Sequence, residues 1–243
     1  MLTKYDYHLV NFDALTYSGN LDNLRDVEDH PRYQFIHGNI CDMVYVEKVV
    51  REYAIDTIVN FAAETHVDRS LLQPGSFIQT DVYGTYVLLD VAKKHQLEKV
   101  VLVSTDEIYG SVEAGSSIET DSYAPNSPYS ASKAGGELMA RAYHITYGLP
   151  VLITRGSNNI GPNQYPEKVV PLFITNALQE MPLPIYGSGL NVRNYIYVTD
   201  HCNGIDVAMH KGISGEIYNV GAGAANERNV LEVASTILNL TGQ

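Results

Sequence analysis

KVVLVSTDEIYG, residues 99–110, decides the fold and raises the functional question. Its first half is a short apolar run rich in β-branched residues, which is typical of a buried strand in a parallel sheet. Two carboxylates, Asp106 and Glu107, follow one residue beyond the expected strand end. Two acids at this position could belong to a solvated turn or to a functional site. The residues expected near this strand end distinguish the two.

Strand-like and helix-like patterns alternate on both sides of this stretch. Such alternation predicts an α/β fold with a doubly wound, mostly parallel sheet and helices on both faces. After residue 156 the sequence is rich in Pro, Gly and Asn, which indicates the loops of a second, smaller lobe. Strands are expected at 8–13, 33–38, 57–63, 99–105, 150–156, 193–198 and 216–221, and helices at about 43–54, 76–96, 128–147, 200–211 and 229–241.

Composition narrows the class of protein. With 243 residues and 45% hydrophobic residues, the chain can bury a substantial core. A net charge of −12 without a basic block argues against nucleic acid or an anionic membrane as partner. No apolar run is as long as a membrane span, and the N-terminus has no signal-peptide core. The two unpatterned cysteines, Cys41 and Cys202, predict neither a disulfide framework nor a metal site, and fit a reducing cytoplasm.

The expected strand ends share one property. In open parallel sheets, ligands bind at the carboxyl ends of the strands. Every one of the first five strands is followed by polar or small residues, and a solvated turn explains that set poorly. The residues are Asp13; Asn39 and Asp42; Ala62, Ala63 and Glu64; Thr105, Asp106 and Glu107; and Arg155, Asn158 and Asn159.

A second chemical signal is YSASK, residues 129–133, at an expected helix start. The spacing places Tyr129 and Lys133 on one helix face. A Lys ammonium beside a phenol lowers the phenol's pKa from about 10, which would let Tyr129 take a proton from a substrate hydroxyl. The pattern alone is common, and it gains meaning from the strand end about 24 residues before it.

With these motifs the sequence resembles the extended short-chain dehydrogenase/reductase family, and within it the nucleotide-sugar 4,6-dehydratases. The Thr-Asp-Glu triplet at 105–107 separates that branch from the sugar-nucleotide epimerases of the family. The resembling segments are NFDALTYSGNL (11–21), NFAAETHVDRS (60–70), STDEIYG (104–110), APNSPYSASKA (124–134), TRGSNNIGPNQYPEKVVP (154–171), LPIYGSGLNVRNY (183–195) and GEIYNVG (215–221).

The resemblance implies a lyase that uses bound NAD to dehydrate dTDP-glucose, as in the supply of 6-deoxyhexoses such as rhamnose. It implies that Tyr129, assisted by Lys133 and Thr105, takes the C4 hydroxyl proton, that Glu107 takes the C5 proton, and that Asp106 protonates the departing C6 hydroxyl. Adjacent acids can divide these roles if their environments separate their pKa values. It also implies a homodimer built on the helices at 76–96 and 128–147.

Further residues carry over from the resemblance as binding residues. Asp13 matches the acid expected on the adenosine ribose. Expected along NAD are Asp13, Ala14, Leu15, Thr16, Asn39, Ile40, Phe61, Ala62, Ala63, Thr80, Tyr129, Lys133 and Asn159. Expected at the sugar nucleotide are Thr65, Thr105, Asn158, Lys168, Val169, Pro184, Ile185, Tyr186, Arg193 and Asn229. Lys168 and Arg193 would meet the diphosphate; ordinary surface charges, and for Tyr186 a packing aromatic, are the alternatives.

The sequence departs from the family pattern at several points. The glycine-rich β–α unit expected before the strand at 8–13 is absent, as is the family's C-terminal end. Residues 1–155 are thus predicted to form a truncated NAD-binding Rossmann-like domain, and 156–243 a partial substrate lobe with late Rossmann elements. A missing central strand would leave its neighbours about 10 Å apart, so we expect poor folding or no activity unless the gap is filled. Asp81 stands where the family usually has Asn.

Three functions therefore stay open at this level. The first is the dTDP-glucose dehydratase. The second is a nucleotide-sugar 4-epimerase or a dehydratase of another nucleotide sugar. The third is a non-catalytic truncated remnant or binding module.

Overall fold

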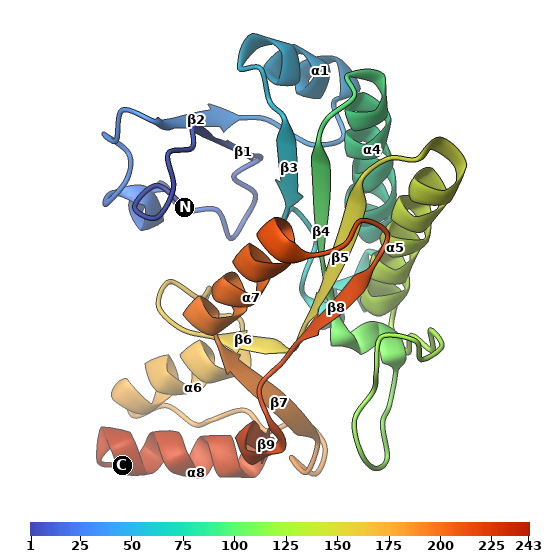
Figure 1. Ribbon diagram of the computed structural model, residues 1–243. Helices are drawn as coiled ribbons and strands as arrows, with labels where there is room; N and C mark the ends of the chain where they lie inside the picture. The colour runs from blue at the N-terminus through green and yellow to red at the C-terminus, as the bar shows by residue number, and fades with distance from the viewer. The chain divides into compact units, whose positions relative to one another are not determined.

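The computed structural model describes all 243 residues. The chain divides into two compact units, of which the first comprises Met1–Arg155 and Ala208–Asn219, and the second Gly156–Val207 and Val220–Gln243. The predicted α/β class is confirmed (Figure 1). No helix is long and apolar enough to cross a membrane.

The first unit contains two parallel sheets that do not pair with each other. Strand β1 (Leu9–Asp13) runs beside β2 (Tyr33–His37), with Leu9 opposite Tyr33. The second sheet has the order β3-β4-β5-β8, formed by Thr57–Asn60, Lys99–Thr105, Val151–Gly156 and Ile217–Val220. The break between β1 and β3 is the place where the sequence predicted that a central strand is missing.

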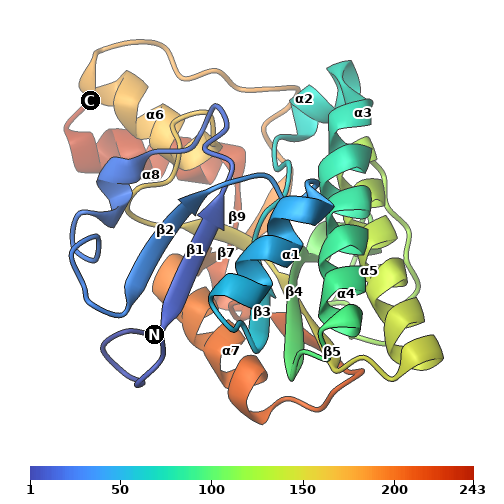
Figure 2. The same ribbon diagram turned by 90° about the horizontal axis from the view of Figure 1, so that it is seen from above.

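Strand β4 forms the centre of the core, as its apolar run predicts. Val101 is fully buried and Leu102 is 3% exposed. Helices α4 (Thr85–Lys94) and α5 (Pro128–Tyr147) pack side by side, with α5 against β4, and α1 (Met43–Glu52) packs on α4 (Figure 2). The apolar faces of these helices and of the strands make one buried cluster, so the chemistry at the end of β4 rests on a rigid base.

Helix α5 begins and ends where local sequence signals place it. The Ser127 hydroxyl accepts from the backbone N–H of Ser130, whose own hydroxyl accepts from the N–H of Ser127, and Pro128 occupies the first turn. Gly148 closes the helix in the left-handed region, with φ of 69°. Tyr129 and Lys133 therefore lie in the first two turns, next to a well-fixed helix start.

The helix expected at 76–96 is divided into three parts. The parts are the end of the short helix α3 (Pro74–Phe77), a π-helical segment, Ile78–Gly84, and α4. Another short helix, α2 (Val67–Leu72), lies before this range. Helix α5 approaches this segment closely, since a Cβ added at Gly136 would lie 2.7 Å from the carbonyl oxygen of Asp81. Apolar periodicity predicts helix here but carries no signal for the wider π turn.

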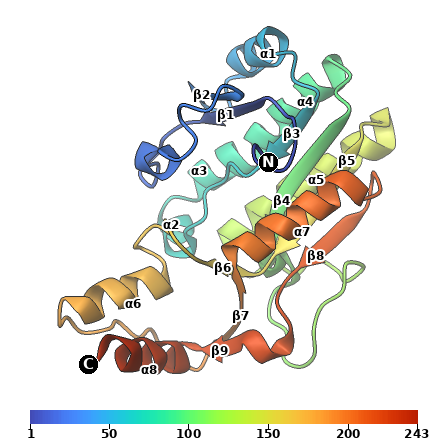
Figure 3. The same cartoon turned by 60° about the vertical axis from the view of Figure 1, so that its left-hand side comes forward.

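The second unit has its own sheet, β6-β7-β9, formed by Asn158–Ile160, Val192–Tyr197 and Glu227–Asn229. Helix α7 (Val198–Lys211) begins in this unit and ends in the first. Helices α6 (Val169–Leu178) and α8 (Val230–Thr241) lie against each other (Figure 3) and bury Phe173 and Ile237. Single 3₁₀ turns occupy Leu21–Leu24, Asp106–Tyr109 and Ala224–Asn226.

The sequence interpretation of this region as loops missed α6. Its flanks are rich in Pro, Gly and Asn, and Pro171 lies within its first turn. Proline is tolerated there because the first backbone N–H groups of a helix have no partner in the helix. The apolar face against α8 then supplies the stabilisation that local propensity does not.

Candidate functional site

The acid pair lies on a single 3₁₀ turn that begins where β4 ends. Thr105 is the last residue of β4 and the N-cap of the turn, and its Oγ1 accepts from the backbone N–H of Glu107 at 3.2 Å. Asp106 and Glu107 are both half-buried. The loop predicted from 106 onward thus starts with an ordered turn that fixes both carboxylates to the sheet.

Tyr129 and Lys133 reach the same strand end from α5. Tyr129 is 9% exposed, and its hydroxyl hydrogen-bonds to Thr105, with the carboxylates of Glu107 and Asp106 close enough to act on its charge. Lys133 is 7% exposed and donates from Nζ to the carbonyl oxygen of Val103 at 2.8 Å. The structure thus brings all five expected catalytic side chains to the end of β4.

The expected lowering of the Tyr129 pKa is wrong for this arrangement. Burial raises the pKa of Tyr129, and the negative charges of Glu107, Asp81 and Asp106 raise it further, while the hydrogen bond to Thr105 opposes them. Lys133 does not offset these effects, because its ammonium is held at the carbonyl of Val103 and burial lowers its own pKa. The four-residue spacing predicts that Tyr129 and Lys133 lie on one helix face. It carries no information about the carboxylates of Asp81, Asp106 and Glu107 near the phenol.

Asp81, on the π-helical segment, is the nearest buried acid outside the predicted set. It is 3% exposed; its Oδ2 accepts from the Ser132 hydroxyl at 2.6 Å and its Oδ1 from the N–H of Glu64 at 2.9 Å. Burial raises the pKa of Asp81 to about 6, although Lys133 and the hydrogen bond from Ser132 lower it. Sequence reasoning noted Asp81 only as a departure from the family; its burial beside Lys133 is visible only in three dimensions.

The expected adenosine-end residues lie at the ends of β1 and β2. Asp13 is exposed and its Oδ1 accepts from the N–H of Leu15 at 2.7 Å, which holds Leu15 at φ of 45°. The side chain of Asn39 is bound in a turn with the N–H of Cys41. Ala14 is fixed through its carbonyl oxygen to His37. Thr16 is exposed, whereas Ile40 is 7% exposed and belongs to the core.

The remaining first-unit residues follow β3 or lie on the π-helical segment. Ala62, Ala63 and Thr80 are half-buried, Thr65 is exposed, and Phe61 is 58% exposed. These small side chains and the Asp13 carboxylate fit a dinucleotide: an exposed acid suits a ribose diol, and alanines leave room near Lys133 and Tyr129. We assign none of the described residues to the pyrophosphate.

The other expected nucleotide-sugar residues all belong to the second unit. Asn158 lies on β6, Lys168 and Val169 at the start of α6, and Arg193 on β7. Asn159, which was expected along NAD, follows Asn158 on β6. Pro184, Ile185 and Tyr186 follow α6, and Ile185 packs against the apolar cluster of that unit. Tyr186 is 74% exposed, which excludes the alternative of a packing aromatic.

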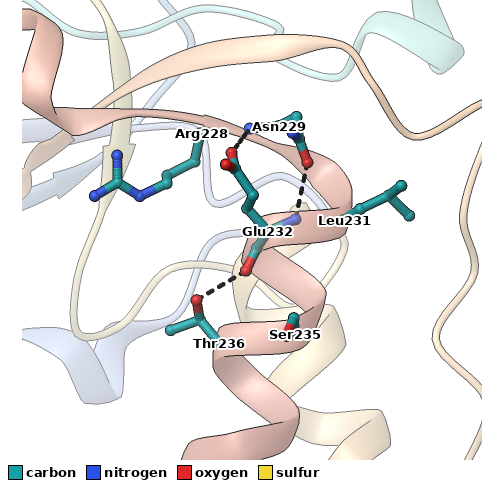
Figure 4. A pocket seen from close by; sticks show the side chains of 6 residues that line it. All are labelled: Arg228, Asn229, Leu231, Glu232, Ser235 and Thr236. Carbon is teal, nitrogen blue, oxygen red and sulfur yellow. Dashed lines mark hydrogen bonds between the residues drawn. The ribbon is translucent and has the colours of Figure 1, made fainter.

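Asn229 is already engaged in the structure of its own helix. Its Oδ1 accepts from the N–H of Glu232, and Glu232 Oε2 accepts from the N–H of Asn229, both at 2.8 Å (Figure 4). The residue lines a surface hollow of about 440 Å³ together with Arg228, Leu231, Glu232, Ser235 and Thr236. This reciprocal capping accounts for Asn229 without a ligand.

Fold and site together define a class: an α/β dinucleotide-binding protein in which a Tyr/Lys pair on a helix meets paired acids at the end of the neighbouring strand. The family model described as GDP-mannose 4,6 dehydratase matches residues 1–242. The chain therefore belongs to this family of nucleotide-sugar dehydratases.

Individual relatives agree with the family. The dTDP-glucose 4,6-dehydratase of an Actinoplanes species is 46% identical over 95% of this chain and 71% of its own length. That of Streptomyces antibioticus is 52% identical over 87% of this chain but only 62% of its own length. The chain thus spans about two thirds of these relatives.

Solved structures separate the two enzyme alternatives. The structure of dTDP-glucose 4,6-dehydratase from Bacillus anthracis, in complex with NAD, is 50% identical, has a TM-score of 0.92, and is matched over 100% of this chain and 76% of that chain. A UDP-glucuronic acid 4-epimerase from Bacillus cereus has a TM-score of 0.89 but is only 28% identical, over 100% and 77% of the two chains. The fold is common to both, and the sequence is similar to the dehydratase.

Proposed function

We propose that the protein dehydrates dTDP-glucose to dTDP-4-keto-6-deoxyglucose with NAD as the tightly held redox cofactor. The observation that carries the proposal is the meeting of Asp106, Glu107 and Thr105 with Tyr129 at the end of β4. The similarity to dTDP-glucose 4,6-dehydratases supports the same substrate.

Tyr129 is the group that takes the C4 hydroxyl proton in this scheme. Its raised pKa keeps the free phenol protonated at neutral pH, so the negative charge around it must fall before it can act as a base. A neutral Asp106 removes one of the three carboxylate charges. Thr105 shares the proton through its hydrogen bond to the phenol, and Lys133 supplies the positive charge in this buried region.

The acids then perform the elimination. A C4 ketone acidifies the C5 proton, which Glu107 accepts, while Asp106 in its neutral form protonates the departing C6 hydroxyl. The two roles require different protonation states of neighbouring carboxyl groups. The Thr105 hydroxyl fixes the turn that carries both acids, because it accepts from the Glu107 N–H and donates to Asp106 Oδ1.

The cofactor would supply the redox chemistry: NAD, when bound, would accept the hydride from C4 of the hexose and return it at C6, while Glu107 returns its proton to C5. Asp13 would hold the adenosine ribose, Ala62, Ala63 and Thr80 would line the path, and Tyr129 and Lys133 would hold the nicotinamide ribose. Lys168 and Arg193 are proposed for the substrate diphosphate, because a guanidinium can bind phosphate oxygens in a bidentate manner.

We propose a homodimer and a cytoplasmic location as well. The family resemblance and the exposed apolar residues Leu138 and Ile145 on α5 support the dimer. The two free cysteines support a reducing compartment.

The test is incubation of the purified chain with NAD and dTDP-glucose, followed by detection of the 4-keto-6-deoxy sugar in alkali and by mass spectrometry as loss of water. UDP-glucose serves as the matched control substrate. A product of unchanged mass with inverted C4 would favour the epimerase. Tight NAD binding without turnover would favour the binding module, and neither binding nor turnover would favour the inactive remnant.

A further inference from the structure

The most buried ion pair of the first unit lies outside the proposed chemistry. Arg155, on β5, is 1% exposed, and Glu137, on α5, is fully buried. Arg155 Nη2 donates to Glu137 Oε2 at 2.7 Å, and Nε donates to Oε1 at 3.3 Å as well as to Oε2 at 3.1 Å. This is the two-pronged geometry that makes arginine–carboxylate contacts both strong and directional.

The remaining nitrogen of Arg155 reaches the turn that carries the acid pair. Arg155 Nη1 donates at 2.6 Å to the hydroxyl of Tyr109, which in turn donates to Asn219 Oδ1 at 2.8 Å. Tyr109 is the last residue of the turn Asp106–Tyr109 and is 7% exposed. Since the turn is only four residues long, an anchor on Tyr109 fixes the backbone of both acids.

The same network holds the loop that follows the turn. Arg155 Nη1 also donates to the carbonyl oxygen of Glu119 at 3.2 Å, while the N–H of Asn219 donates to Glu119 Oε1 at 2.8 Å. Asn219 Nδ2 donates to the carbonyl oxygen of Ser117 at 3.1 Å. The contacts close a ring from the turn through β8 and the loop back to Arg155.

We propose that Arg155, Glu137 and Tyr109 are positioning residues that set the orientation of Asp106 and Glu107. A buried ion pair contributes little net stability compared with apolar packing, whereas its geometry is strict. Tyr109 transmits that geometry, because its hydroxyl has one donor and one acceptor partner and so a single favoured orientation. The expected effect on turnover rests on the proposed function. The expected effect on the order of the turn Asp106–Tyr109 does not.

Tyr109→Phe tests the inference, with Tyr123→Phe as the matched control. Tyr123 also gives a hydroxyl to this network, to Glu137 Oε2 at 3.0 Å, but lies in the loop rather than in the turn. Each variant removes one oxygen. The readout is hydrogen exchange of the backbone amides of Glu107 and Gly110, which bond to Thr105 Oγ1 and to the carbonyl oxygen of Glu107.

In Tyr109→Phe we expect these two amides to exchange about tenfold faster or more, as for the loss of a hydrogen bond to a charged donor, with β4 core amides unchanged. In Tyr123→Phe they should keep the rate of the parent. Unchanged exchange in Tyr109→Phe, equal acceleration in both variants, or acceleration spread over β4 would each overturn the inference.

The experiment needs no turnover, so it stands even if the proposed function fails. Where the chain is active, Tyr109→Phe should lower kcat while leaving KM unchanged, and Tyr123→Phe should do neither. An active Tyr109→Phe with parental kcat would overturn the catalytic part of the inference alone.

Discussion

Two buried carboxylates, Glu137 on α5 and Asp81 on the π-helical segment that packs against α5, have different kinds of partner. Glu137 is fully buried and meets the guanidinium of Arg155. Asp81 is 3% exposed and accepts hydrogen bonds from the Ser132 hydroxyl and the Glu64 N–H. Burial raises the pKa of Asp81 to about 6, although the charge of the Lys133 ammonium lowers it without a direct hydrogen bond.

The comparison of Glu137 with Asp81 shows that the hydrogen-bond partners of a buried acid determine its role. A carboxylate in direct contact with a guanidinium serves as a fixed anchor, which is how Glu137 connects through Arg155 to the turn of Asp106 and Glu107. A carboxylate with fewer donors titrates near neutrality. Asp81 can therefore change charge beside Lys133 in the pH range where the enzyme would work.

Breaking the Glu137 pair should have the largest effect on stability. Arg155→Met leaves a carboxylate buried without its cation, which costs about 3–5 kcal/mol of unfolding free energy. Urea denaturation followed by circular dichroism measures it. The double variant Arg155→Met/Glu137→Met is the control and should recover most of the loss; equal loss in both variants would show that packing rather than charge matters here.

Removing the charge of Asp81 should stabilise the protein at neutral pH. Because its folded pKa of about 6 lies above the ordinary 3.8, the folded state binds more protons, and stability falls as pH rises through that window. At about 1.4 kcal/mol per pKa unit, Asp81→Asn should gain about 3 kcal/mol at pH 7.5.

An Asn at position 81 can keep both contacts, with its oxygen accepting from Glu64 and its amide donating to Ser132. The gain should shrink as the pH falls from 6 to 4 and vanish only well below the ordinary 3.8, where Asp81 is protonated in both states. Urea midpoints for parent and variant at pH 4, 5, 6 and 7.5 provide the measurement. A constant difference across that range would contradict an elevated Asp81 pKa.

The smallest effect concerns the hydroxyl of Ser132. This hydroxyl has one hydrogen but two acceptors, Asp81 Oδ2 at 2.6 Å and the carbonyl oxygen of Tyr129 at 2.7 Å. With Asp81 ionised the hydrogen stabilises the carboxylate, so Ser132→Ala should cost about 1 kcal/mol more at pH 7.5 than at pH 5. Ser130→Ala, at the neighbouring helix start, is a control whose cost should not depend on pH.

The sequence predicted the regular parts of the molecule well. Helix α5 was expected at 128–147 and occupies those residues, because a serine cap, a proline and a closing glycine all agree with its apolar face. The strand at 99–105 was equally well marked by its continuous apolar run. The place of Thr105, Asp106 and Glu107 at the ligand-binding edge followed from the rule that parallel strands present their carboxyl ends there. Their meeting with Tyr129 was expected from the family resemblance.

What the sequence could not predict depends on contacts between distant residues. The π-helical turn at Ile78–Gly84 lies against Gly136, and the raised pKa of Tyr129 comes from burial and from carboxylates on two separate segments. Helix α6 is stabilised mainly by its contact with α8. The network of Arg155 joins residues from 109 to 219, a separation that no local pattern encodes.

The most direct test of the central claim, that the acids after Thr105 act with Tyr129 on one hexose, is a single-turnover experiment on Glu107→Gln. The purified chain with NAD and dTDP-glucose is quenched at intervals, and C4 oxidation and water loss are followed separately by mass spectrometry. The account predicts that oxidation at C4 persists while water loss slows by about 10²–10⁴-fold, the usual contribution of a general base. Water loss at the parental rate would contradict it.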